Sequence, residues 1–92
     1  MKQYSDTAKA DLASIKSYIA EDNPAAAERT IARILQSIRF LKDVPRLGRV
    51  GLLPDTRELS IIGLPFRVVY RIEGDTVLVA TIVHGARQIP RP

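Results

Sequence analysis

The only histidine of the chain, His84, lies close to arginines near the C-terminal end, where the sequence reads TIVHGARQIPRP. Imidazole is the side chain best suited to proton transfer near neutral pH. One guanidinium group can bind two oxygens of a phosphate or carboxylate at once, through two parallel hydrogen bonds. His84 with Arg87, and Arg67 in an earlier stretch, could therefore bind an anion and move a proton. The alternative for His84 is structural, with the ring ending a strand and bonding a backbone carbonyl.

The charge of the chain is unevenly distributed. The 92 residues carry 14 Lys and Arg against 10 Asp and Glu, a net charge of +4. Residues 1–43 are nearly balanced, whereas residues 44–92 hold seven basic side chains, all of them arginine, and four acidic ones. This surplus predicts an anionic partner, either a nucleic acid or an acidic protein segment. A basic surface that only keeps the protein in solution is the alternative.

Composition excludes several classes of protein. The chain has no cysteine, so it forms no disulfide and no thiolate metal site. With one histidine and scattered carboxylates we expect no metal and no cofactor, and no glycine-rich phosphate loop or G-x-S-x-G motif is present. The longest apolar run, VLVATIVHG, is far shorter than the about 20 residues that span a bilayer, and no secretory signal is visible. We expect a cytoplasmic protein with one domain, residues 1–92.

Two helices and three strands are predicted to position these groups. Ser5 is a suitable N-cap for a helix that ends near Asp22, and Asn23 with Pro24 begins a second helix that ends near Lys42. Both helices carry apolar residues at spacings of three and four. After a predicted loop over residues 43–56, the apolar period changes to two, which predicts three strands: 57–61, 66–72 and 76–84. A short strand at 2–4 has weaker support. The predicted fold class is α+β, a helical hairpin packed on a small antiparallel sheet.

The turn at Gly74–Asp75 favours type II′ geometry and sets the predicted register, with Arg71 opposite Leu78 and Arg67 opposite Ile82. One face of the sheet then holds Arg67, Val69, Arg71, Leu78, Ala80, Ile82 and His84. The other face is more apolar and is expected to lie under the helices. Arg67, His84 and Arg87 are thus predicted to converge on the open face. The alternative for Arg67 is a salt bridge to Glu58 on the neighbouring strand.

The chain as a whole resembles the RelE/ParE superfamily of toxins from bacterial type II toxin–antitoxin modules. The matching stretches are AKADLASIKSYIAEDNPAAAERTIARI, FLKDVPRLGR, TREL, PFRVVYRI and VATIVHGARQIP, in the order typical of the family. The resemblance implies the element order β-α-α-β-β-β and growth inhibition that a cognate antitoxin neutralises. It also implies that the antitoxin is a small acidic protein, with a DNA-binding N-terminal part, that forms a hetero-oligomer with the toxin.

The superfamily divides by cellular target. ParE-like members poison DNA gyrase, and the long, even helical hairpin favours this branch. The alternative is a RelE-like endonuclease that cleaves mRNA in the ribosome, for which the resemblance implies Arg67, His84 and Arg87 as catalytic residues. A degenerate toxin that only binds antitoxin is a third possibility. For target or antitoxin binding the expected residues are Arg49, Arg57, Arg67, Arg71 and Arg87.

Overall fold

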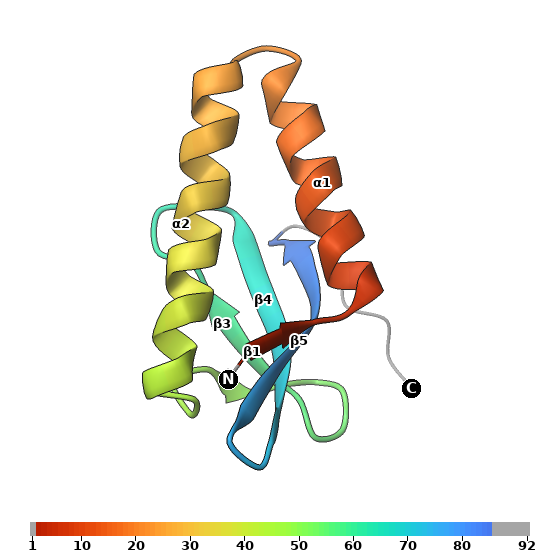
Figure 1. The fold of residues 1–92 in the computed structure, drawn as a ribbon, viewed down its shortest axis with the longest axis vertical. Coiled ribbons are helices and arrows are strands. Elements are labelled where there is room, and N and C mark those ends of the chain that lie inside the picture. Colours follow the sequence, from red (N-terminus) through yellow and green to blue (C-terminus); the bar gives the residue numbers. More distant parts are fainter. Residues whose placement is uncertain (1, 86–92) are drawn as a thin grey trace.

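The computed structural model describes residues 2–85, which form two layers. Figure 1 shows two antiparallel helices that cover one face of a sheet and extend beyond its upper end. The sheet has five strands in the order β1-β5-β4-β3-β2. The elements along the chain are β1 (Lys2–Tyr4), α1 (Asp6–Ala20), α2 (Pro24–Asp43), β2 (Arg49–Val50), β3 (Arg57–Ser60), β4 (Phe66–Glu73) and β5 (Thr76–His84). No helix within residues 2–85 has the length and apolar composition needed to cross a membrane.

Both helices begin where the sequence predicts. The Ser5 side chain accepts a hydrogen bond from the Ala8 amide at 3.0 Å, and Asn23 caps α2 in the same way. Pro24 occupies the first turn of α2, where a missing N–H costs nothing. The first helix ends at Ala20, two residues earlier than expected, and the second ends at Asp43.

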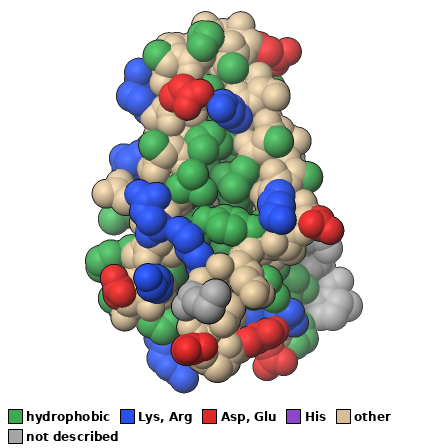
Figure 2. Space-filling view, viewed as in Figure 1, with side chains coloured by type: hydrophobic (Ala, Val, Ile, Leu, Met, Phe, Trp, Pro, Cys, Tyr) green, Lys and Arg blue, Asp and Glu red, His purple; other side chains and the backbone are tan. Residues whose placement is uncertain are grey.

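The core lies between the hairpin and the two central strands. Large side chains with almost no exposed surface come from α2, β4 and β5, namely Ile34, Ile38, Leu41, Val68, Tyr70 and Val79. Burying one such aliphatic side chain contributes about 1.5–3 kcal/mol. In Figure 2, which shows the helix-covered side, apolar side chains fill the seam between the helices, and Lys and Arg flank it.

The sheet differs from the prediction in two respects. The N-terminal strand forms and pairs in parallel with β5, so the sheet is mixed and not wholly antiparallel. A two-residue strand, β2, also lies inside the segment predicted as a loop, and it pairs with β3. The β4–β5 turn is as expected: Gly74 has φ 62°, whereas Asp75 has no positive φ, which fits type II′.

The predicted register of β4 and β5 is wrong beyond Val79. Near the turn, Arg71 pairs with Leu78 as expected, but a β-bulge follows, after which Val69 pairs with Thr81 and Arg67 with Val83. The bulge inserts one extra residue in β5, and such an insertion reverses which side chains share a face. Phe66 therefore lies opposite His84 on the helix-covered face.

Contacts with α1 and its cap hold the bulge. The Ser5 amide donates to the Val79 carbonyl at 2.9 Å, and its hydroxyl donates to the Ala80 carbonyl at 2.5 Å. Six residues further along the chain, the Asp11 carboxylate accepts hydrogen bonds from the Ile82 amide at 2.9 Å and the Thr81 hydroxyl at 2.5 Å. These bonds satisfy hydrogen-bonding groups at the edge of β5 beyond the residues that pair with β1.

A buried tyrosine attaches the segment after α2 to the sheet. The Tyr70 hydroxyl donates to the Pro45 carbonyl at 2.6 Å and accepts the Gly48 amide at 2.9 Å. Gly48 is required here because an added Cβ would lie 2.7 Å from the Tyr70 oxygen and 2.8 Å from the Glu58 carbonyl oxygen. The Arg57 guanidinium donates to the Gly48 carbonyl at 2.8 Å. The chain that follows α2 is therefore fixed to β3 and β4.

Replacing Tyr70 with Phe should lower the free energy of unfolding by about 1–3 kcal/mol, because the Gly48 amide and the Pro45 carbonyl lose a buried partner. Urea denaturation followed by circular dichroism measures the change. The matched control is Tyr18→Phe, since the Tyr18 side chain is 76% exposed and should tolerate the substitution. Equal stability of the two variants would contradict this role for Tyr70.

Alkaline pH should destabilise the protein through the same tyrosine. Burial raises the pKa of Tyr70 above 10.0, although the Gly48 amide and the charge of Arg57 act in the opposite direction. Above pH 10 the unfolded chain therefore loses a phenolic proton that the folded chain retains, so the free energy of unfolding falls as pH rises. Urea midpoints across this range should fall less steeply for Tyr70→Phe. Burial also raises the pKa of Tyr4. The stability of Tyr70→Phe should therefore still fall to some extent as pH rises.

Candidate functional site

A buried carboxylate organises the sheet face that the helices leave uncovered. Glu58 lies on β3 with 1% of its side chain exposed, and its Oε1 is 3.0 Å from Nη1 of Arg67 on β4. The Arg67 side chain is itself only 16% exposed. The salt bridge given above as the alternative for Arg67 is thus confirmed. A buried charge requires such a partner, because desolvation without one is very costly.

A second arginine and a backbone amide complete this cluster, which we call the Glu58 cluster. Arg49 on β2 reaches Oε1 of Glu58 at 3.4 Å, and the Leu52 amide donates to Oε2 at 3.1 Å. The Arg49 side chain is 69% exposed, so it is the part of the cluster that meets solvent. One carboxylate between two guanidinium groups gives a net charge of +1, and this charge lies at the surface with Arg49.

Two further predicted arginines, Arg57 and Arg71, do not join the Glu58 cluster. Arg57 points to the opposite side of β3, where it donates to the backbone carbonyls of Gly48 and Arg46. Arg71 shares a strand face with Arg67 but pairs with Glu73 at 3.1 Å on the surface. Arg87 lies outside the described residues.

His84 belongs to the other side of the sheet. Its ring meets Phe66 edge-on, with centroids 5.6 Å apart and planes at 82°. It contributes to a hollow of about 790 Å³ between the projecting helices and the upper ends of β4 and β5, and Asp11 and Tyr18 also line this hollow. The geometry suits an apolar partner segment with a few polar groups.

The predicted convergence of Arg67 and His84 on one open face is therefore wrong. The Arg67 guanidinium lies in the Glu58 cluster on the uncovered face, whereas the bulge in β5 turns the His84 imidazole to the helix side. A general acid or base and a phosphate clamp must contact the same reacting group, and these two side chains face different surfaces. No cluster of three or more potential metal ligands occurs among residues 2–85.

Sequence reasoning missed the residues that decide this arrangement. Asp11 was assigned only to a helix, although it holds the bulge from 70 positions away. The structure shows the bulge in the burial of β5, where Val77 and Val79 are followed by Ile82, a step of three where a regular strand has two. The sequence contained one signal, Thr81, a polar residue that a regular register places under the helices.

Comparison with known proteins identifies the family. Residues 3–89 match the family described as "ParE toxin of type II toxin-antitoxin system, parDE". The chain belongs to this family. It is thus a toxin of a type II toxin–antitoxin system, as the resemblance of its motifs implied.

Relatives of this ParE-family toxin extend over most of its length. It is 39% identical over 80 residues to "Putative toxin Y4kP" of Sinorhizobium fredii, covering 87% of this chain and 82% of that protein. It is 32% identical over 80 residues to "Toxin RelE2" of Caulobacter vibrioides, covering 87% and 89%.

Solved structures confirm the fold. The toxin superposes on a chain of the chromosomal ParDE system of P. aeruginosa with a TM-score of 0.82, at 24% identity and covering 90% of this chain and 92% of that one. With a chain of the intact E. coli RelBE complex the TM-score is 0.64, at 13% identity and covering 95% and 98%. The predicted α+β arrangement is therefore the fold of RelE and ParE toxins.

Neutralising Glu58 should destabilise the toxin strongly. Glu58→Gln keeps the shape but leaves the poorly exposed Arg67 charge without its carboxylate, and we expect a loss of about 3–5 kcal/mol in urea denaturation. Glu28→Gln is the matched control, because its bridge to Lys16 is exposed on both sides and should contribute at most about 1 kcal/mol. A Glu58→Gln variant as stable as the control would show that the buried pair is dispensable.

Proposed function

We propose that this toxin inhibits growth by binding DNA gyrase, and that it acts without catalysing a reaction of its own. The observation that carries the proposal is the match to the ParE family over residues 3–89, because the ParE branch is the one associated with gyrase. The Glu58 cluster supports it further. Arg67 is engaged by a buried carboxylate, which a substrate phosphate would have to displace.

A ribosome-dependent endonuclease is the second candidate. The relative named "Toxin RelE2" favours it, and so does the presence of Arg67, His84 and Arg87 at positions like those of RelE-like enzymes. In that case the arginines would stabilise phosphate charge, and His84 would be the acid or base. The placement of Arg67 and His84 on opposite faces of the sheet weighs against this candidate.

We propose that the partner in the resting cell is a small acidic antitoxin with a DNA-binding N-terminal part, and that the two proteins form a hetero-oligomer in the cytoplasm. The structural neighbours come from toxin–antitoxin systems named ParDE and RelBE. The net charge of +4 favours an acidic partner, and complementary charges accelerate association. Two hollows beside the helices offer apolar surface to a chain that folds on binding.

Purified toxin should inhibit DNA supercoiling by purified bacterial gyrase, and mRNA should stay intact in primer extension after induction of the toxin. The variant His84→Gln should inhibit gyrase to the same extent as the wild type, because His84 is not needed for a reaction. Site-specific mRNA cleavage that disappears in His84→Gln, with supercoiling unaffected by the wild type, would establish the endonuclease instead.

A further inference from the structure

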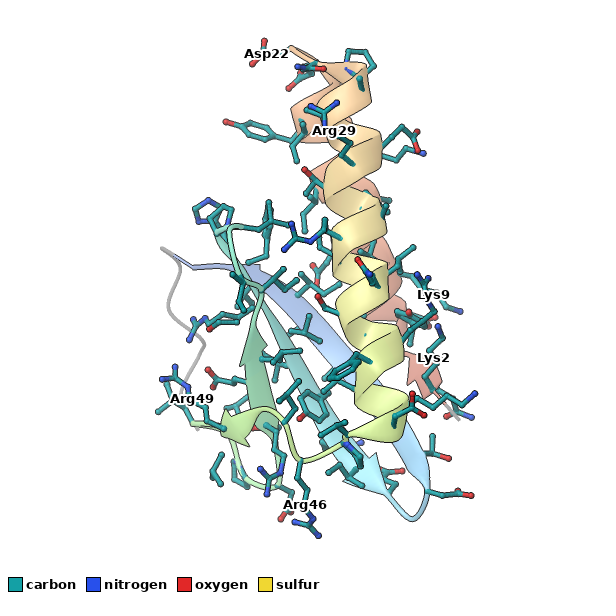
Figure 3. The ribbon with its side chains drawn as sticks, turned by 90° about the vertical axis from the view of Figure 1, so that its left-hand side faces the viewer. Lys2, Lys9, Asp22, Arg29, Arg46 and Arg49 are labelled. Atoms are coloured by element: carbon teal, nitrogen blue, oxygen red, sulfur yellow. The ribbon has the colours of Figure 1, made fainter. Side chains whose placement is uncertain are left out.

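Exposed apolar side chains surround a hollow of about 620 Å³ between α2 and β3, which we call the α2–β3 hollow. Among residues 2–85, seven large apolar side chains are exposed, and three of them line this hollow: Phe40, Leu47 and Ile62. Figure 3 views the molecule from the side on which α2 and β3 lie. Apolar side chains that gather around one groove indicate a binding surface more strongly than isolated ones do.

The backbone of Ser60 faces the α2–β3 hollow from the edge of the sheet. The Ile61 amide donates to the Phe66 carbonyl at 3.0 Å, and the Gly51 amide donates to the Thr56 carbonyl at 2.8 Å. Backbone groups along a strand point alternately to its two neighbours, so residues of β3 with odd numbers face β4 and those with even numbers face β2. The N–H and C=O of Ser60, which lines the hollow, therefore point away from β4.

The neighbouring strand begins only after the position that would lie opposite Ser60. In β2, Arg49 pairs with Glu58, and the same register would place Leu47 opposite Ser60. The Leu47 amide instead donates to the Val44 carbonyl at 3.1 Å, so the chain forms a turn here. Within residues 2–85 no strand pairs with Ser60 on this edge, and Ser60 is exposed. One position of the sheet edge is therefore open to another chain.

An extended segment is the occupant that fits such an edge. The backbone groups of a helix are bonded within the helix, whereas an extended chain can offer one N–H and one C=O to Ser60. Leu59 and Ile61, on either side of Ser60, pack on the core beneath the helices. Side chains alternate along a strand. The two residues that flank the one bonded to Ser60 would therefore also point to the helix-covered side, into the α2–β3 hollow.

The charged side chains around the hollow favour an acidic segment. Two arginines, Arg33 and Arg39, line it together with one acid, Asp43, which gives a net charge of +1. The Arg33 guanidinium also donates to the Ile62 carbonyl at 2.5 Å, which holds this charge beside the hollow. We propose that an extended segment of the acidic antitoxin adds to the edge of β3 at Ser60, with two apolar side chains in the α2–β3 hollow and a carboxylate near its arginines.

This inference rests on the proposed antitoxin partner, and amide hydrogen exchange measured by NMR separates the two. The probe is the complete protein encoded by the reading frame beside the toxin gene, added to the full-length toxin until calorimetry shows saturation. In the complex, the Ser60 amide should exchange at least about tenfold more slowly than in the free toxin. The Ile61 amide, which already bonds to Phe66, is the internal control and should be protected in both states.

The variant Ser60→Pro removes the outward N–H and leaves the hydrogen bonds between β3 and β4 in place. It should bind the antitoxin at least about tenfold more weakly, because a carbonyl of the antitoxin loses its partner. Ser60→Ala is the matched control, since it removes the hydroxyl but keeps the N–H, and it should bind as the wild type does.

The acidic contact is tested by Arg39→Gln, which should slow association with the antitoxin, most of all at low salt. Arg29→Gln is its matched control, because Arg29 lies near the tip of the helical hairpin and does not line the α2–β3 hollow (Figure 3). Equal association rates for the two variants would overturn the acidic contact.

Urea denaturation shows whether the variants are folded, and if Ser60→Pro is not, exchange of the wild-type Ser60 amide decides alone. A complex in which this amide exchanges as fast as in the free toxin overturns the inference. So does a folded Ser60→Pro variant that binds as tightly as Ser60→Ala. In both cases the antitoxin is still the partner. If the neighbouring protein does not bind the wild-type toxin, the proposed partner fails, and the inference fails with it.

Discussion

The arrangement of functional groups depends on how the start of α1 binds the free edge of β5. The Ser5 N–H and hydroxyl donate hydrogen bonds to two carbonyls of β5. One carboxylate oxygen of Asp11 accepts hydrogen bonds from an amide and a hydroxyl of the same strand. These bonds hold an extra residue in β5, and that residue decides which side chains share a face. A regular strand would have brought His84 to the side of Arg67. The bulge places it beside Phe66, under the projecting helices.

The two faces of the sheet consequently have different chemistry. The uncovered face contains a compensated ion cluster in which Glu58 engages a buried and an exposed arginine. The helix side contains an apolar hollow with His84 at its rim. Among residues 2–85, Arg67 and His84 lie on different faces of the sheet.

Local signals predicted a large part of the fold. Ser5 and the pair Asn23–Pro24 correctly predicted where the two helices begin, because capping depends on a few adjacent residues. Gly74 predicted the β4–β5 turn for the same reason. The strand β2 was not predictable, since its two residues are held by Glu58 and Arg57 from the next strand. The bulge was missed because its partner Asp11 is distant in sequence. The sequence left two alternatives for Arg67, a position on an anion-binding face with His84 or a salt bridge to Glu58. Only the strand register seen in the structure decided between them.

The pairing of β1 with β5 also bears on how the toxin is made. Residues 2–4 pair with residues 77–79, and Ser5 bonds Ala80, so residues 2–5 cannot reach their places in the sheet before β5 has been synthesised. Contacts this distant close slowly because loop closure must come first. Figure 1 shows β1 joining the sheet beside β5, the final strand. A partly translated chain that lacks β5 therefore lacks the finished sheet, so the toxin cannot reach its folded form before residues 76–84 have been synthesised.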